Sequence, residues 1–85
     1  MYYYVYIIKD LHNNSIYIGR TNNLVRRLWE HNNRKSKYTK RSIWKLIYFE
    51  GYLSEFSAKN REIKLKQYGR VYSQLKRRIF NDIGK

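Results

Sequence analysis

The segment SIYIGRTNNLVRRLWEH, residues Ser15 to His31, changes from strand-like to helix-like sequence and decides the fold. Residues 16–19 form a short strand-like run that ends in glycine. After Asn23, apolar residues recur with the spacing of a stripe along a helix: Leu24, Val25, Leu28 and Trp29. Thr21, Asn22 and Asn23 are residue types that cap helix N-termini. The segment therefore predicts a strand over 16–19 and a helix over 24–33.

Two more runs are strand-like. Residues 2–9, YYYVYIIK, are almost entirely β-branched or aromatic, and apolar residues occupy both parities. That pattern is typical of a strand covered on both faces, so we expect it to be the central strand. His12, Asn13 and Asn14 supply turn chemistry and predict a hairpin to the strand over 16–19. Residues 43–52, IWKLIYFEGY, predict a third strand.

Two helices follow the third strand. Ser54 can cap a helix that reaches about Tyr68 and ends at Gly69, and apolar residues at i, i+4 spacing predict a last helix over 70–83. The order β-β-α-β-α-α indicates the α+β class, with a small three-stranded antiparallel sheet flanked by helices. No proline, repeat or low-complexity stretch marks a boundary, so residues 1–85 are expected to form a single domain.

The composition favours a polyanionic partner. Nineteen lysines and arginines against six acidic residues give a formal net charge of +13, which a compact body tolerates when a partner such as nucleic acid compensates it. The charges are spread along the chain rather than along one amphipathic helix, which disfavours a membrane surface. The absence of cysteine excludes disulfides and thiolate metal sites. The N-terminal apolar run has no basic segment before it and is too short to span a bilayer, so we expect a cytoplasmic protein.

The predicted geometry gathers polar side chains near the strand-to-helix junction. Arg27 and His31 lie only about 40° apart around their helix, at the rim of its apolar stripe. A hairpin loop with an even number of residues, such as Asn13 and Asn14, places Tyr6, Tyr17 and Gly19 on one face of the sheet. Taken alone, each residue is better explained by ordinary packing: the arginine covers the core, the histidine ends a helix and the tyrosines fill a half-buried sheet.

Two acidic residues have different predicted surroundings. Glu62 lies between Ala58 and Leu65 on the side of its helix that looks buried, where a carboxylate requires a cation. Lys59, Arg61 and Lys66 are the candidate partners if this is an ordinary ion pair. Glu30 is flanked by Arg26 and Arg34 at i±4, which predicts a surface pairing.

Four separated segments together resemble the GIY-YIG nuclease family. Tyr17-Ile18-Gly19 matches its second signature tripeptide, and Tyr4-Val5-Tyr6 takes the place of the first, keeping its terminal tyrosine. NNLVRRLWEH is similar to the family's arginine-bearing helix, and SAKNREIKLK to the later helix that carries its glutamate. A first tripeptide that keeps only its terminal tyrosine resembles that of the small stand-alone, YhbQ-like or UPF0213-like, members. The resemblance covers nearly the whole chain.

The resemblance implies a site and a chemistry. The catalytic candidates are Tyr6, Tyr17, Arg27, His31 and Glu62; Lys9 and Gly19 are supporting candidates. Glu62 would hold one Mg²⁺ or Mn²⁺ ion, mainly when substrate is present, because such ions keep several waters and take phosphate oxygens as further ligands. Arg27 would brace the phosphoryl oxygens. The resemblance leaves Tyr6 and His31 both open as the base that activates water.

The expected partner is DNA, whether duplex, single-stranded or branched. The nucleic-acid-binding candidates lie in the basic segment 34–42 and the last helix: Lys35, Lys37, Tyr38, Lys40, Arg41, Lys76 and Arg77. Tyr38 and Trp44 are candidates for stacking on an unpaired base. Since a chain of this length leaves no room for a targeting domain, we expect low sequence specificity or a targeting partner protein. The alternative is a basic nucleic-acid-binding module of the same fold with little or no activity. The oligomeric state stays open.

Overall fold

The structure, a computed structural model, describes residues 1–33, 43–67 and 69–82. Its element order is β1 (Tyr3–Asp10), β2 (Ile16–Thr21), α1 (Leu24–Asn32), β3 (Trp44–Tyr52), α2 (Glu55–Gln67) and α3 (Gly69–Asp82). The strands form one antiparallel sheet in the order β2-β1-β3. The α+β class, the order of elements and the central position predicted for residues 2–9 are confirmed, with boundaries within two residues of those expected.

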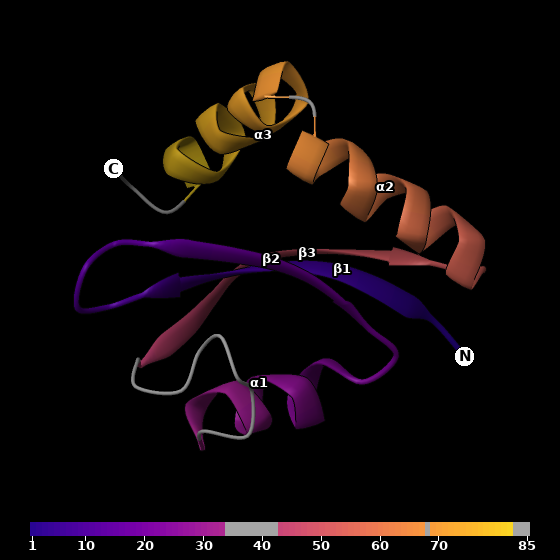
Figure 1. The fold of residues 1–85 in the computed structure, drawn as a ribbon, viewed down its shortest axis with the longest axis horizontal. Coiled ribbons are helices and arrows are strands. Elements are labelled where there is room, and N and C mark those ends of the chain that lie inside the picture. Colours follow the sequence, from indigo (N-terminus) through magenta and orange to yellow (C-terminus); the bar gives the residue numbers. More distant parts are fainter. Residues whose placement is uncertain (34–42, 68, 83–85) are drawn as a thin grey trace.

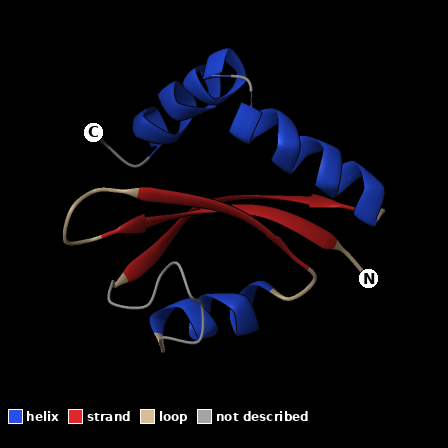
Figure 2. Cartoon of the chain, in the orientation of Figure 1, coloured by secondary structure: helices blue, strands red, loops and turns tan. Residues whose placement is uncertain are grey.

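The sheet separates two layers of helix. Figure 1 shows α1 on one face and α2 with α3 on the other, and Figure 2 shows the same arrangement by element type. A hydrophobic core lies on each face of the sheet, because successive side chains of β1 point to opposite faces. Val5 and Ile7 pack towards α2 and α3, whereas Tyr6 and Ile8 pack towards α1. A strand apolar at both parities is therefore buried on both sides, as its sequence predicted.

The hairpin between β1 and β2 is longer than expected but has the predicted parity. The Asp10 N–H donates to the carbonyl of Ser15 at 2.8 Å, so residues 11–14 form the turn. Asn14 adopts a φ of 63°, in the left-handed region that asparagine tolerates. Four residues preserve the even loop length, and Tyr6 therefore pairs with Gly19 while Ile8 pairs with Tyr17. The prediction that Tyr6, Tyr17 and Gly19 share a face is confirmed.

Helix α1 begins as predicted but turns a different side towards the sheet. The Asn23 side chain accepts a hydrogen bond from the Arg26 N–H at 3.0 Å, which confirms the N-cap. Leu24 and Leu28 pack against the sheet, yet Val25 and Trp29 are 83% and 55% exposed. The predicted four-residue stripe is therefore wrong in half of its members. The cause is His31, which is fully buried and completes a contact face centred on the two leucines.

A polar network fixes α2 to β3. The Glu50 carboxylate accepts hydrogen bonds from the hydroxyls of Tyr48 and Tyr52, each at 2.6 Å. It also accepts both forks of the Arg61 guanidinium, at 2.8 and 2.9 Å. Burial alone would raise the pKa of Glu50, but these hydrogen bonds outweigh burial and lower it below its ordinary value. Because Arg61 precedes Glu62, the network anchors α2 one residue from the acidic candidate.

Candidate active site

The Tyr6 hydroxyl is the centre of the candidate site. Its oxygen lies 2.8 Å from His31 Nε2 and 3.4 Å from Arg27 Nε, which donates to it. Arg27 and His31 are four positions apart on one face of α1, as the sequence predicted. This spacing brings both side chains to the central strand β1. With the His31 proton on Nδ1, the phenol donates its own proton to Nε2. The structure thus joins three of the five catalytic candidates by direct contacts.

Tyr6, His31 and Arg27 form a cluster, and burial determines the protonation states of its tyrosine and histidine. Burial raises the pKa of Tyr6 to about 12, although the hydrogen bond from Arg27 acts in the opposite direction. Burial and the nearby Arg27 charge lower the pKa of His31 to about 4. At neutral pH the phenol therefore keeps its proton and the imidazole is neutral, with one nitrogen able to accept a proton. His31 is consequently more than a last-turn residue that complements a helix dipole.

The bare surface at Gly19 is required by the tyrosines around it. A Cβ at this position would overlap Tyr6 Oη and would lie 2.6 Å from Tyr6 Cζ and 2.8 Å from Tyr17 Cε1. The Tyr17 ring lies 4.9 Å from the His31 ring and 6.3 Å from the Tyr6 ring, measured between centroids. Glycine is therefore required at this position, because the side chains of Tyr6 and Tyr17 leave no space for a Cβ atom. The Tyr17 ring packs against His31 at one side of the cluster.

The Arg27 guanidinium is held on two sides. Nε contacts the phenol, while Nη1 forms an ion pair with Glu30 Oε1 at 3.0 Å. The prediction that Glu30 pairs with its i±4 neighbours is wrong for Arg26, whose Nη2 donates instead to Asn22. Burial would lower the pKa of Arg27, but its hydrogen bonds to Tyr6 and Glu30 raise it, so the guanidinium is always charged. Its side chain is still about one third open to solvent.

Glu62 approaches the cluster from the other layer, past the edge strand β2. Lys66 Nζ lies 3.0 Å from Glu62 Oε2, and Arg20 Nε lies 3.6 Å from Oε1, with the carboxylate side chain only 16% exposed. Of the predicted partners, Lys66 is confirmed, and Arg61 is engaged by Glu50 instead. Arg20 was missed, although its place directly after Gly19 puts it on the α2 face by strand alternation. The negative charge of Glu62 contributes to the raised pKa of Tyr6, so Glu62 is electrostatically coupled to the tyrosine.

The donor set suits a metal ion held loosely. No three histidine, cysteine or acidic side chains gather into a metal cluster within the described part of the chain. Glu62 offers one carboxylate, and each of its oxygens already faces a cation. A magnesium-like ion that keeps its waters and takes phosphate oxygens fits such a site, because it needs only one or two carboxylates. An ion that needs a preformed cage of protein ligands does not fit this site.

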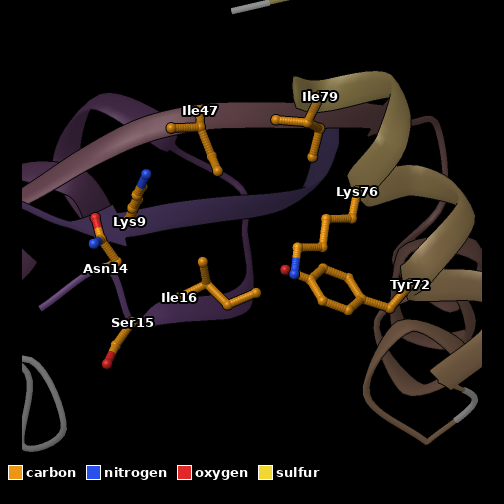
Figure 3. Close-up of a pocket in the computed structure, with 8 residues that line it drawn as sticks. All are labelled: Lys9, Asn14, Ser15, Ile16, Ile47, Tyr72, Lys76 and Ile79. Atoms are coloured by element: carbon orange, nitrogen blue, oxygen red, sulfur yellow. The ribbon is translucent and has the colours of Figure 1, made fainter. Parts of the chain in front are cut away.

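Lys9 lies on the opposite face of the sheet from Tyr6. As an odd-numbered residue of β1 it points towards α3 and lines a cavity of about 560 Å³ together with Tyr72 and Lys76 (Figure 3). The rest of its lining is Asn14, Ser15, Ile16, Ile47 and Ile79. The structure therefore does not bring Lys9 to the cluster, and strand alternation already contained that signal.

The nucleic-acid-binding candidates divide into two groups. Lys35, Lys37, Tyr38, Lys40 and Arg41 lie outside the described residues. Lys76 and Arg77 lie on the exposed surface of α3. Trp44, expected to be available for stacking, is buried: its ring packs against those of Tyr17 and His31, with centroids 6.4 and 6.5 Å away. That expectation is wrong, because the side chain closes the core beneath α1.

The fold and the cluster define a small basic α+β domain with tyrosines, an arginine and a histidine on one side of a sheet edge and a glutamate on the other. The family model for the GIY-YIG catalytic domain matches residues 2–78, so the chain belongs to the GIY-YIG family and thereby to a nuclease superfamily. The resemblance stated from the sequence is confirmed. In residues 1–33, 43–67 and 69–82, no helix has the length and apolar character needed to cross a membrane.

The similar proteins are small members of one group. The chain is 44% identical over 69 residues to the UPF0213 protein CPE1444 of Clostridium perfringens, covering 79% of this chain and 73% of that protein. It is 41% identical over 70 residues to the UPF0213 protein SH2523 of Staphylococcus haemolyticus, covering 80% and 84%. The solution NMR structure of the UPF0213 protein BH0048 from Bacillus halodurans has a TM-score of 0.56 at 32% identity, covering 88% and 82%. That likeness confirms the order β-β-α-β-α-α.

Proposed function

We propose that residues 1–85 act as one domain, a divalent-metal-dependent endonuclease that hydrolyses DNA phosphodiester bonds with little preference for sequence. The observation that carries the proposal is the Tyr6 hydroxyl, held 2.8 Å from a neutral His31 and 3.4 Å from a charged Arg27. A phenol placed between a proton acceptor and a cation suits the activation of water next to a phosphate. The membership of a nuclease superfamily supports the same reaction class.

Proton transfer runs through the hydrogen-bonded pair. Water attacks the phosphorus atom and the ester bond from phosphorus to the leaving oxygen breaks. The proton of the water passes to Tyr6 Oη, the phenolic proton passes to His31 Nε2, and the leaving oxygen takes a proton from solvent. This order avoids a free phenolate, which a pKa of about 12 makes rare at neutral pH, and uses an imidazole whose pKa of about 4 leaves it unprotonated. The proposal therefore assigns contact with the water to Tyr6 and receipt of the proton to His31.

Two groups would stabilise the negative charge that develops on the reacting phosphate. The Arg27 guanidinium donates to the non-bridging oxygens, where a preorganised donor stabilises the transition state by about 3 kcal/mol. Glu62 would hold a Mg²⁺ or Mn²⁺ ion, which would supply Lewis-acid stabilisation of the negative charge that develops at the phosphate. Tyr17 shapes the wall against which the substrate lies, since its ring packs on His31.

The test is cleavage of labelled DNA in single-stranded, duplex, flap and junction form, with Mg²⁺ or Mn²⁺ and with EDTA. Glu62→Gln and Arg27→Ala should each lower the rate at least about 100-fold, the loss expected when a transition-state contact disappears. Glu55→Gln removes an exposed acid from the same helix and should cut as the wild type does. Equal rates for Glu62→Gln and wild type would reject the site.

The second candidate is a basic binding module without turnover. It is favoured by the engagement of both Glu62 oxygens with Lys66 and Arg20, which is also what a structural ion pair looks like. A binder would shift DNA with a steep salt dependence and leave it intact when metal is added. The cleavage assay above separates the two candidates.

A further inference from the structure

Three aromatic side chains lie next to one another on the face of the sheet that carries Tyr6, and two of them are exposed. Tyr2 and Phe49 are each 52% exposed, and Tyr4 between them is half-buried. The ring centroids are 6.3 Å apart for Tyr2 and Tyr4 and 6.0 Å apart for Tyr4 and Phe49. We call these residues the aromatic row. Exposed aromatic side chains packed side by side are uncommon on a surface that has no partner.

The aromatic row continues directly from the candidate site. Phe49 pairs with Tyr6 across β1 and β3, on the side opposite Gly19. Tyr4 precedes Tyr6 by two residues on the same face of β1, which is a separation of about 7 Å. Helix α1 covers Tyr6 but leaves the aromatic row open, since its leucines pack with Tyr6, Ile8 and Trp44. A ligand on the aromatic row would therefore lie beside Tyr6 on the β3 side, while the Tyr6 hydroxyl lies over Gly19 on the β2 side.

The chemistry of this surface selects its occupant. Aromatic rings on an open sheet stack well against nucleobases, and a net charge of +13 attracts the phosphate backbone that joins those bases. Bases in a duplex are already stacked on one another and cannot lie flat on side chains. Arg27, at the Tyr6 end, is a charged contact for the phosphate next to the first stacked base. An apolar protein surface would gain nothing from that charge.

We propose that the aromatic row binds unpaired DNA bases beside the reacting phosphate and thereby makes the protein prefer single-stranded segments. The proposal rests on the function proposed above, because it takes the Tyr6 cluster as the place of cleavage. It assigns the preference to Tyr2, Tyr4 and Phe49, and not to Trp44 in the core.

The experiment measures binding in EDTA, where no cleavage occurs, by the anisotropy of a fluorescent oligothymidylate and of a duplex of equal length. Tyr2→Ala and Phe49→Ala should each weaken single-strand binding about 5- to 100-fold, the range for losing one stacked base, and leave duplex binding unchanged. Phe56→Ala removes an exposed aromatic residue from α2 and should change neither. An oligonucleotide with abasic sites should bind the wild type as weakly as the variants bind the intact strand.

The outcomes separate this proposal from the proposed function. If the wild type cuts DNA but both variants bind single strands as tightly as it does, the aromatic row is not the determinant. Equal losses on single strand and duplex also overturn the proposal, because they indicate general electrostatic binding or altered folding. If the wild type cuts no DNA yet the variants lose single-strand binding, hydrolysis is refuted while the stacking surface stands. Fluorescence of 2-aminopurine in the oligonucleotide should be quenched by the wild type and by Phe56→Ala, and less by Phe49→Ala.

Discussion

Replacing Gly19 by alanine should disable the site through a single methyl group. The new Cβ would lie 2.6 Å from Tyr6 Cζ and 2.8 Å from Tyr17 Cε1. An ordinary carbon–carbon contact is about 3.5 Å, so the Tyr6 ring must withdraw by roughly 0.9 Å. That movement is enough to break the 3.4 Å contact with Arg27 and to stretch the 2.8 Å contact with His31.

The expected magnitudes follow from packing and from positioning. Forcing an extra methyl group into a filled space costs about 1–3 kcal/mol. For a domain of this size, 2 kcal/mol lowers Tm by about 8–16 °C. A displacement near 1 Å in a reacting group costs about 100-fold in rate, well beyond the loss caused by partial unfolding at 25 °C. Thermal denaturation followed by circular dichroism gives the first value, and single-turnover nicking at saturating protein gives the second.

Gly51→Ala is the matched control. Gly51 also lies in an edge strand beside a tyrosine, but its Cβ would meet Tyr4 Cε1 at 3.5 Å, which is an ordinary contact. Tm should change by less than about 2 °C, as expected when no contact is strained. If Gly19→Ala melts and cuts like the wild type, the close approach of Tyr6 to β2 is not a requirement of the site.

Three further changes test other contacts. Tyr6→Phe keeps the ring and removes the hydroxyl, so nicking should fall about 100-fold, whereas Tm should fall by only about 4–8 °C because His31 loses the hydrogen bond from the phenol; unchanged nicking would exclude the phenol as a proton carrier. Glu50→Gln should destabilise by about 2 kcal/mol in urea unfolding because it removes a charged acceptor of Arg61. Since the folded pKa of Glu50 is lowered, its stabilisation is present above the ordinary value of 4.5 and is lost as the pH falls below it, so the variant's Tm should lack that part of the acid dependence. Lys66→Ala removes a competitor for Glu62 and should tighten Mn²⁺ binding about 3- to 10-fold, measured by titration calorimetry, and an unchanged affinity would contradict a shared carboxylate.

Local patterns predicted the architecture because the spacing of apolar residues along the sequence distinguishes helices from strands. The doubly apolar run at 2–9, the Asn23 cap and the parity of the hairpin depend on neighbours within a few residues. Parity alone was sufficient to put Tyr6 and Gly19 on one face, although the turn has residues 11–14 rather than two asparagines. The same rule places Lys9 on the other face.

What the sequence did not predict depends on packing between layers. Whether Trp29 or His31 is buried is decided by how α1 rotates on the sheet, and apolarity alone selects the wrong residue. The Glu50 network needs β3 and α2 to meet, because Arg61 follows Glu50 by 11 positions in the chain. Arg20 becomes a partner of Glu62 only when α2 lies over β2.

The position of the sheet between Arg27 and Glu62 has a consequence for how such domains can diversify. The two residues belong to helices that lie against different faces, and β1 and β2 are the scaffold common to both. In the proposed mechanism, substitutions on α1 act first on proton transfer and substitutions on α2 act first on ion binding, although the charge of Glu62 also contributes to the raised pKa of Tyr6. Changes in β2 act on both at once. The two helices can therefore be varied separately in engineered variants, whereas β2, which carries Gly19 next to Tyr6, tolerates little change.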